Sequence, residues 1–104
     1  MTIKLDEISL ENGDVLTDES SEVARIWVTN NAGSSVWINP TVLAEPIEFG
    51  YLMADSIRHA ARAYSLAWDM PEENVLQLMC DGLLAELREQ VRDIEMIKFG
   101  KKLN

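Results

Sequence analysis

The sequence predicts a small α+β domain in which an antiparallel β-hairpin packs against two antiparallel α-helices. Three observations indicate this class. Residues 22–39 favour extended backbone and contain a glycine-bearing break. Two later segments, 46–68 and 70–98, repeat apolar residues at helical spacing. The 104 residues, 47% of them hydrophobic and 26% charged, suit a single soluble globular domain, 1–104, with a modest core.

The predicted hairpin, 22–39, joins two strands through a three-residue loop at 31–33. Gly33 suits the left-handed position of such a loop, and Pro40 ends the second strand because it cannot donate to a sheet ladder. In this register the facing pairs are Ile26 with Ile38, Val28 with Val36, and Trp27 with Trp37. One face of the hairpin is then aliphatic, and the other carries two tryptophans.

The first helix is predicted over 46–68, with Pro46 in its first turn. Its apolar residues share one arc at roughly 100° per residue. These residues are Phe49, Met53, Ile57, Ala60, Ala61, Tyr64 and Trp68.

The second helix is predicted over 70–98, where Asp69 and Glu72 form a capping box and Pro71 lies in the first turn. Gly100 is the expected stop. At roughly 1.5 Å per residue this helix is longer than the first, so its distal part is expected to project past its partner. Its apolar arc contains Leu76, Met79, Cys80, Leu83, Leu84, Leu87, Val91, Ile94 and Ile97.

Charge is unevenly distributed between the two ends of the chain. An acidic N-terminal arm, 1–21, precedes the hairpin, and its residues 3–10 alternate in a way that allows an additional N-terminal strand. Residues 1–24 hold seven acidic residues and one basic residue, which fits either a solvated arm or a surface for a basic protein partner. A basic tail, 99–104, follows the second helix.

The overall totals argue against several classes of partner. A formal net charge of −9 repels phosphate backbones, so no nucleic-acid partner is expected. No apolar run reaches the roughly 18–20 residues of a membrane span, so no membrane partner is expected. The single cysteine, Cys80, excludes an intrachain disulfide and favours a reducing, cytoplasmic location.

One group of polar residues on the first helix could carry chemistry. Asp55, Arg58, His59 and Arg62 share a wedge of roughly 100° away from the apolar arc, with Tyr51 nearby. Asp55 and His59 are four residues apart, so they can meet as a carboxylate and an imidazole do in general-base pairs. The simpler interpretation is an exposed helix face with local ion pairs. No catalytic residue is assigned, and Asp55, Arg58 and His59 are candidates.

The sequence predicts neither a metal site nor a cofactor. One histidine and one cysteine cannot supply a zinc ligand set, and neither an HExxH nor a CxxC motif is present. A glycine-rich phosphate loop and a GxSxG motif are also absent from the sequence. Cys80 lies on an apolar arc, where an unreactive buried thiol is typical.

The two tryptophans give the leading functional hypothesis. If the aliphatic face of the hairpin packs on the helices, the face bearing Trp27 and Trp37 still needs cover. A second subunit, the N-terminal segment or a ligand could supply that cover, and Arg25 and Tyr51 are further candidates for such a contact. We favour a non-enzymatic homodimer, and the alternative is a small-ligand-binding or hydrolytic site around Asp55, Arg58 and His59.

Several residues resemble a known family. Arg25 and Trp27 form an R-x-W strand, and the first helix carries an aromatic-Gly-x-x-x-Ala-Asp-x-x-Arg-His-x-Ala-x-Ala-Tyr pattern. The pattern residues are Phe49, Gly50, Ala54, Asp55, Arg58, His59, Ala61, Ala63 and Tyr64. This resembles a family of bacterial proteins of about one hundred residues that is catalogued as a domain of unknown function. The resemblance covers roughly residues 22–86; it implies the hairpin-and-helices fold and no activity, and the chain departs from the pattern after about residue 88.

Overall fold

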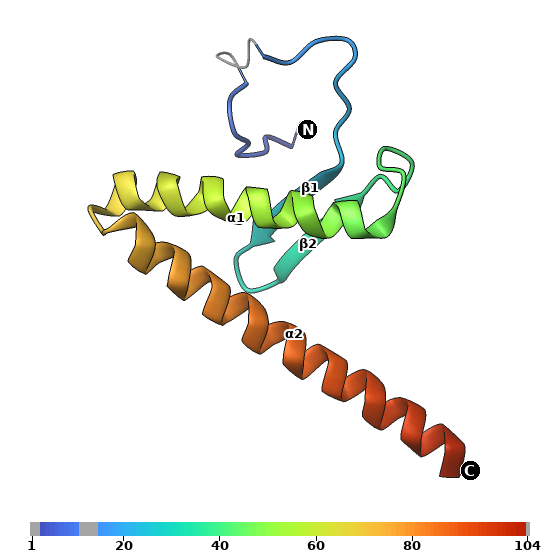
Figure 1. Cartoon of the computed structure of the whole chain (residues 1–104). Helices are drawn as coiled ribbons and strands as arrows, with labels where there is room; N and C mark the ends of the chain where they lie inside the picture. Colours follow the sequence, from blue (N-terminus) through green and yellow to red (C-terminus); the bar gives the residue numbers. More distant parts are fainter. Residues whose placement is uncertain (1–2, 11–14, 104) are drawn as a thin grey trace. The chain divides into compact units, whose positions relative to one another are not determined.

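The computed structural model describes residues 3–10 and 15–103 of the chain, with side chains up to residue 94. Four elements follow one another: β1 (Ala24–Thr29), β2 (Gly33–Ile38), α1 (Pro46–Trp68) and α2 (Glu72–Leu103), as Figure 1 shows. The predicted α+β class with one antiparallel hairpin and two helices is confirmed. The chain divides into two compact units, 1–44 with the hairpin and 45–104 with the helix pair. The single domain predicted from the sequence stays a prediction.

The hairpin forms where it was predicted, but its register differs from the predicted one. In the structure Trp27 lies opposite Ser35 and Trp37 lies opposite Arg25, so the predicted pairing of Trp27 with Trp37 is wrong. The facing aliphatic residues are Ile26 with Val36 and Ala24 with Ile38, in place of the predicted partners. The shift is an even number of residues, so both tryptophans still share one face.

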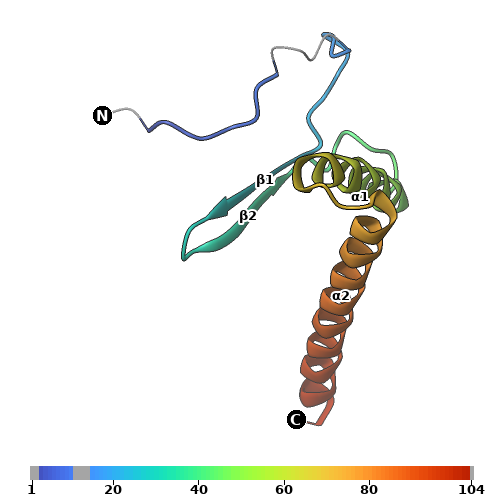
Figure 2. The same ribbon diagram turned by 90° about the vertical axis from the view of Figure 1, so that its left-hand side faces the viewer.

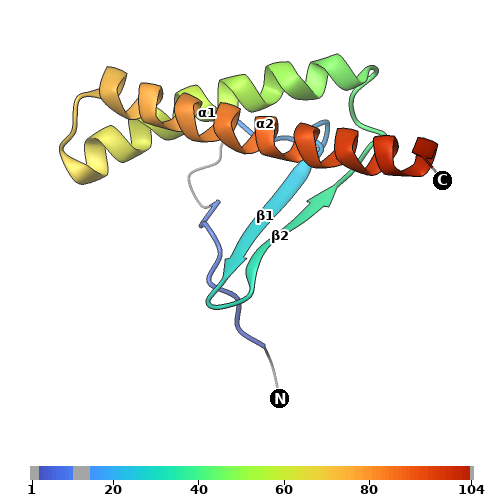
Figure 3. The same ribbon diagram turned by 90° about the horizontal axis from the view of Figure 1, so that it is seen from below.

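The loop explains the shifted register. Thr29 pairs with Gly33 and closes the hairpin around residues 30–32, one residue earlier than predicted. The N–H of Ala32 donates to the carbonyl of Thr29 at 3.0 Å, and Asn31 takes a left-handed φ of 64°. Asparagine tolerates this conformation, so the turn can close before the glycine. Gly33 has a φ of 77°, which confirms its predicted left-handed conformation (Figure 3 shows the ribbon).

The N-terminal segment adds no strand within the described residues. Residues 3–10 have no regular structure, and the described sheet contains only β1 and β2. The possible additional strand is therefore not formed there. Just after β2, the N–H of Asn39 donates to the carbonyl of Val23 at 2.8 Å, which extends the ladder by one bond before Pro40.

Helix α1 begins at a proline, as predicted. Pro46 occupies the first turn, where its missing N–H is not needed. The N–H of Glu45 donates to Oε2 of Glu48 at 2.9 Å, so a carboxylate three residues ahead caps the helix start. The predicted apolar arc is covered over much of its length, with Ala61 fully buried. At the end of the helix the cover is lost, and Trp68 is 65% exposed.

The turn between the helices differs from the predicted capping box. Asp69 ends α1 in a left-handed conformation, φ 54° and ψ 53°, and its N–H donates to the carbonyl of Ser65. The predicted role of Asp69 as the cap of the second helix is therefore wrong. The carbonyl of Pro71 instead accepts the N–H of Asn74 at 3.1 Å, and α2 starts at Glu72. The prolyl carbonyl thus begins the helix where a side-chain cap was expected.

Helix α2 is continuous from Glu72 to Leu103, as Figure 2 shows. The predicted stop at Gly100 is wrong, because the helix continues through that residue and past the predicted end at 98. Near the turn, α2 contacts α1, and Val75 is 5% exposed. Beyond Cys80, every described side chain from 81 to 94 is exposed, and α2 diverges from α1 in Figure 1. The predicted projection of the distal part is therefore confirmed.

Candidate functional site

The tryptophan face of the hairpin brings three predicted site residues together. Arg25 and Trp27 alternate on β1, so their side chains leave the same face of the sheet. Trp37 on β2 lies directly opposite Arg25 and diagonal to Trp27. The R-x-W pattern of the sequence therefore becomes one continuous surface of two indoles and a guanidinium.

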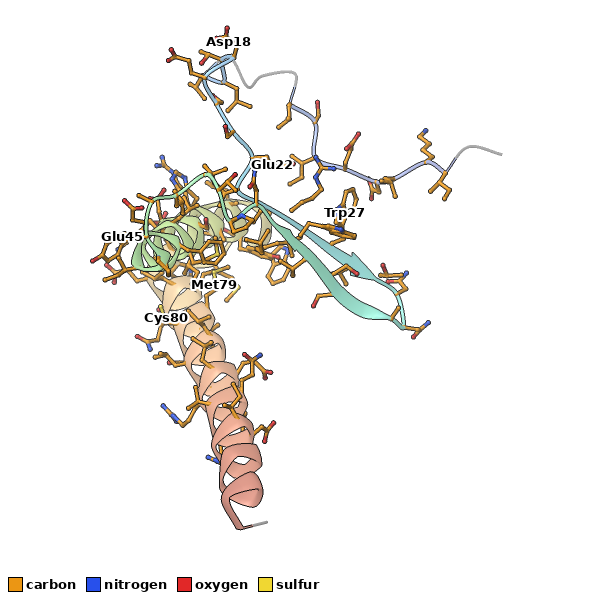
Figure 4. All side chains as sticks on the ribbon, turned by 90° about the vertical axis from the view of Figure 1, so that its right-hand side faces the viewer. Asp18, Glu22, Trp27, Glu45, Met79 and Cys80 are labelled. Atoms are coloured by element: carbon orange, nitrogen blue, oxygen red, sulfur yellow. The ribbon has the colours of Figure 1, made fainter. Side chains whose placement is uncertain are left out.

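An open hollow of about 460 Å³ lies on this face. Trp37 is 62% exposed there, while Trp27 is only partly exposed. Figure 4 shows Trp27 on the side of the hairpin where the N-terminal segment runs, and Leu5 of that segment lines the hollow. The N-terminal segment therefore covers part of this face and leaves Trp37 open. The lining residues are Leu5, Glu22, Val23, Ala24, Arg25, Trp27, Trp37, Ile38 and Asn39.

The charge of Arg25 is balanced within the hairpin unit. Its Nε donates to Oε2 of Glu22 at 3.1 Å, and its Nη2 donates to Oε1 at 2.7 Å. This two-pronged hydrogen bond is the main reason that the pKa of Arg25 is raised; the charge of Glu22 follows, and that of Glu7 adds a smaller contribution. The hollow therefore presents an ion pair beside its tryptophans, and an anionic ligand would have to displace Glu22 to reach Arg25.

The opposite face of the hairpin is aliphatic and equally open. Its exposed fractions are 62% for Ile26, 79% for Val28, 53% for Val36 and 47% for Ile38. The four residues come from alternate positions of both strands and form one contiguous patch. Both faces of the ribbon are thus apolar and accessible, which is unusual for a two-stranded sheet in water.

The predicted polar cluster on α1 forms one close pair. Nε2 of His59 lies 3.4 Å from Oδ2 of Asp55, and the two side chains are 77% and 66% exposed. Arg58 is exposed on the same helix, and Tyr51 is 66% exposed. The pair therefore lies on the outside of α1, as the interpretation with local ion pairs expected, while its catalytic role stays a prediction.

The part of the chain that the structure describes contains no group of three or more His, Cys, Asp or Glu residues that could hold a metal ion. Cys80 is half-buried on α2. Within the described residues, none of the helices has the length and apolar character needed to cross a membrane. The described residues of the acidic segment, 3–10 and 15–22, are exposed, and their role in binding a basic protein stays a prediction.

The distal part of the apolar arc predicted on α2 is exposed in the structure. Exposed fractions are 56% for Leu84, 47% for Leu87, 52% for Val91 and 52% for Ile94. Their spacing of three, four and three residues was visible in the sequence and is typical of a helix that pairs with another helix. We call these four residues the distal stripe.

Comparisons with known proteins agree with this fold. A family model described as a domain of unknown function, DUF5076, matches residues 13–91. None of the curated proteins matches the sequence. A solved structure from the photosynthetic bacterium Rhodopseudomonas palustrus CGA009, described as a "putative pyruvate dehydrogenase", is 26% identical. The similarity covers 83% of this chain and 86% of that one, with a TM-score of 0.62.

Proposed function

Because the chain belongs to the DUF5076 family, whose description gives no activity, we propose a function from its own surfaces: a non-enzymatic protein that works as a homodimer. The observation that carries this proposal is the hairpin with two open apolar faces. The patch formed by Ile26, Val28, Val36 and Ile38 is more than half exposed on average, while Trp37 is exposed on the other face. An isolated two-stranded hairpin needs further packing to be stable in water. A second copy supplies that packing.

The size of the patch indicates how tight such a contact can be. Complete burial of a Val or Ile side chain contributes about 1.5–3 kcal/mol, so burying the exposed part of each contributes about 1 kcal/mol. Four residues in each of two copies then contribute roughly 8 kcal/mol. Association itself costs roughly 4–15 kcal/mol in lost freedom. The hairpin patch alone therefore supports a weak dimer, and a stable dimer needs a further contact.

Sedimentation velocity between nanomolar and high micromolar concentration tests the homodimer. We expect a reversible monomer–dimer equilibrium, and substitution Val36→Lys should weaken it by more than tenfold, because a charge in the patch must be desolvated. Asn30→Lys in the hairpin loop is the matched control, since Asn30 is exposed and lies outside both strands. A wild-type chain that stays monomeric throughout this range would refute the proposal.

A second candidate function is a small-ligand-binding or hydrolytic site around Asp55, Arg58 and His59. The 3.4 Å contact between Asp55 and His59 favours it, because a carboxylate can orient an imidazole as a general base. The test is hydrolysis of chromogenic carboxylate and phosphate esters by the wild type, Asp55→Asn and His59→Ala. This candidate expects turnover that either substitution removes, and rates equal in all three proteins would eliminate it.

A further inference from the structure

The distal stripe lies on a part of α2 where every described side chain is exposed. Leu84, Leu87, Val91 and Ile94 follow one another at intervals of three, four and three residues, and each is about half exposed. Single exposed apolar residues are normal on protein surfaces. Four at this spacing on one helix face form a continuous seam, which is the pattern of paired helices.

A hollow that could accept a side chain lies on the distal stripe. A shallow hollow of about 440 Å³ is lined by Leu84, Leu87, Arg88, Val91 and Arg92. Four of these residues stand at positions i, i+3, i+4 and i+7, which is the set that forms the hole for a knob in helix-to-helix packing. A hole of this kind accepts a side chain from a neighbouring helix, so the shape indicates a helical occupant.

We propose that the occupant is the distal stripe of a second copy of this chain, paired antiparallel. The inference rests on the proposed homodimer and names its second contact. A second copy offers knobs at the same spacing. In an antiparallel arrangement Leu84 meets Ile94 and Leu87 meets Val91, so each layer combines one leucine with one β-branched residue.

A row of charged residues flanks the distal stripe. Arg92 is paired with Glu89 of its own helix at 3.2 Å, whereas no acidic residue stands three or four positions from Arg88. Asp81 lies seven residues before Arg88 and Glu95 lies seven residues after it, so the three share one heptad position beside the stripe. The sign of the charge alternates along this flank. In the antiparallel register proposed, Arg88 of each copy lies beside Arg88 of the other and Asp81 lies beside Glu95, so like charges meet along this flank and weaken the pair at low salt. The antiparallel direction therefore rests on the apolar layers, each of which combines a leucine with a β-branched residue.

The first test compares Leu87→Glu with Ala85→Glu by sedimentation velocity on the full chain. Ala85 is also exposed on α2 but lies off the stripe, so it is the matched control. We expect Leu87→Glu to raise the dimer dissociation constant at least tenfold, with unchanged helical circular dichroism, and Ala85→Glu to leave it within twofold. A wild-type dimer whose dissociation constant is equal in both variants would overturn the inference but leave the proposed homodimer intact. A monomeric wild type would refute both.

The second test reports direction and does not depend on a destabilising charge. Leu87→Cys and Val91→Cys chains, each with Cys80→Ser, are mixed and oxidised. We expect the mixed disulfide between the two variants to form faster than either self-disulfide. Faster self-linking of each variant would indicate a parallel pair and overturn the proposed direction. Absence of every cross-link, as expected if the chain's own hairpin covers the stripe, would overturn the whole inference.

Discussion

The best-defined packing in the chain is at Ala61, and enlarging this side chain should destabilise the helix pair. Ala61 is 0% exposed on α1, and Val75 on α2 is 5% exposed; they are the two buried hydrophobic side chains among the described residues. Substitution Ala61→Leu adds three carbon atoms to a side chain with no exposed surface, on a helix that contacts α2. Overpacking of this kind costs about 1–3 kcal/mol, because neighbouring side chains or the backbone must move.

For a domain of this size, about 2 kcal/mol corresponds to a decrease in Tm of about 10 °C. Ala63→Leu is the matched control, because Ala63 is exposed on the same helix and both changes have the same helix propensity. Thermal unfolding followed by circular dichroism at 222 nm measures both variants at one protein concentration. If Ala61→Leu melts at the temperature of Ala63→Leu, the space beside Ala61 is not closed and the described core is wrong.

Three further predictions follow from local geometry. Gly33→Ala should destabilise the hairpin by about 1–2 kcal/mol, because a φ of 77° is strained for any residue with a β-carbon; chemical denaturation measures the loss, and an unchanged free energy of unfolding would contradict the left-handed assignment. His59→Ala should change the free energy of unfolding by less than about 0.5 kcal/mol, because its helix-surface contact with Asp55 is exposed; a larger loss in the same assay would show that His59 has a packing role. Because the pKa of Arg25 is higher in the folded than in the unfolded chain, its pairing with Glu22 stabilises the fold at every pH below the pKa of the unfolded chain, and this stabilisation is lost only as pH rises through the pKa of the folded chain. The Tm difference between wild type and Glu22→Gln should therefore be constant from about pH 7 to pH 9, and a difference that falls across this range would contradict the assignment.

Local chemistry made the hairpin predictable, but not its register. The β-branched and aromatic residues of 22–39 located the strands, and Gly33 located the turn. The error arose because Asn31 also accepts a left-handed conformation, which allows a loop one residue earlier with the same number of residues. The faces survived the error because the register moved by an even number of residues.

The two helices were predictable from the sequence, but their caps were not, and neither was the length of α2 that α1 covers. Pro46 marked the start of α1 correctly. Asp69 has the residue type of an N-cap, but it also tolerates the left-handed conformation that ends a helix, and the structure uses the second property. The arc of α2 predicted an apolar face, yet periodicity alone cannot say where a partner helix stops covering that face. This depends on how α1 and α2 diverge, which is a property of their tertiary contact (Figure 1).

For the candidate site, the sequence proposed Arg25, Trp27 and Trp37 as contact residues, a role that stays a prediction, and the structure places all three around one hollow. Tyr51 was proposed as a further contact residue, and it is exposed on α1. The sequence predicted that the distal part of α2 projects past α1, but the hole at Leu84 was not identified from it. The three-four-three spacing of the distal stripe is the signal in the sequence that could have indicated this hole.

The cover that ends at Cys80 divides α2 into two lengths with different environments. In a monomer, amides between Glu72 and Cys80 should exchange with deuterated solvent only when the helix pair opens, whereas those between Asp81 and Ile94 should exchange by local fraying at a much lower free energy. Protection along one uninterrupted helix would thus fall from its first turns toward its far half. Slowing of exchange in that far half as the protein is concentrated would register association residue by residue.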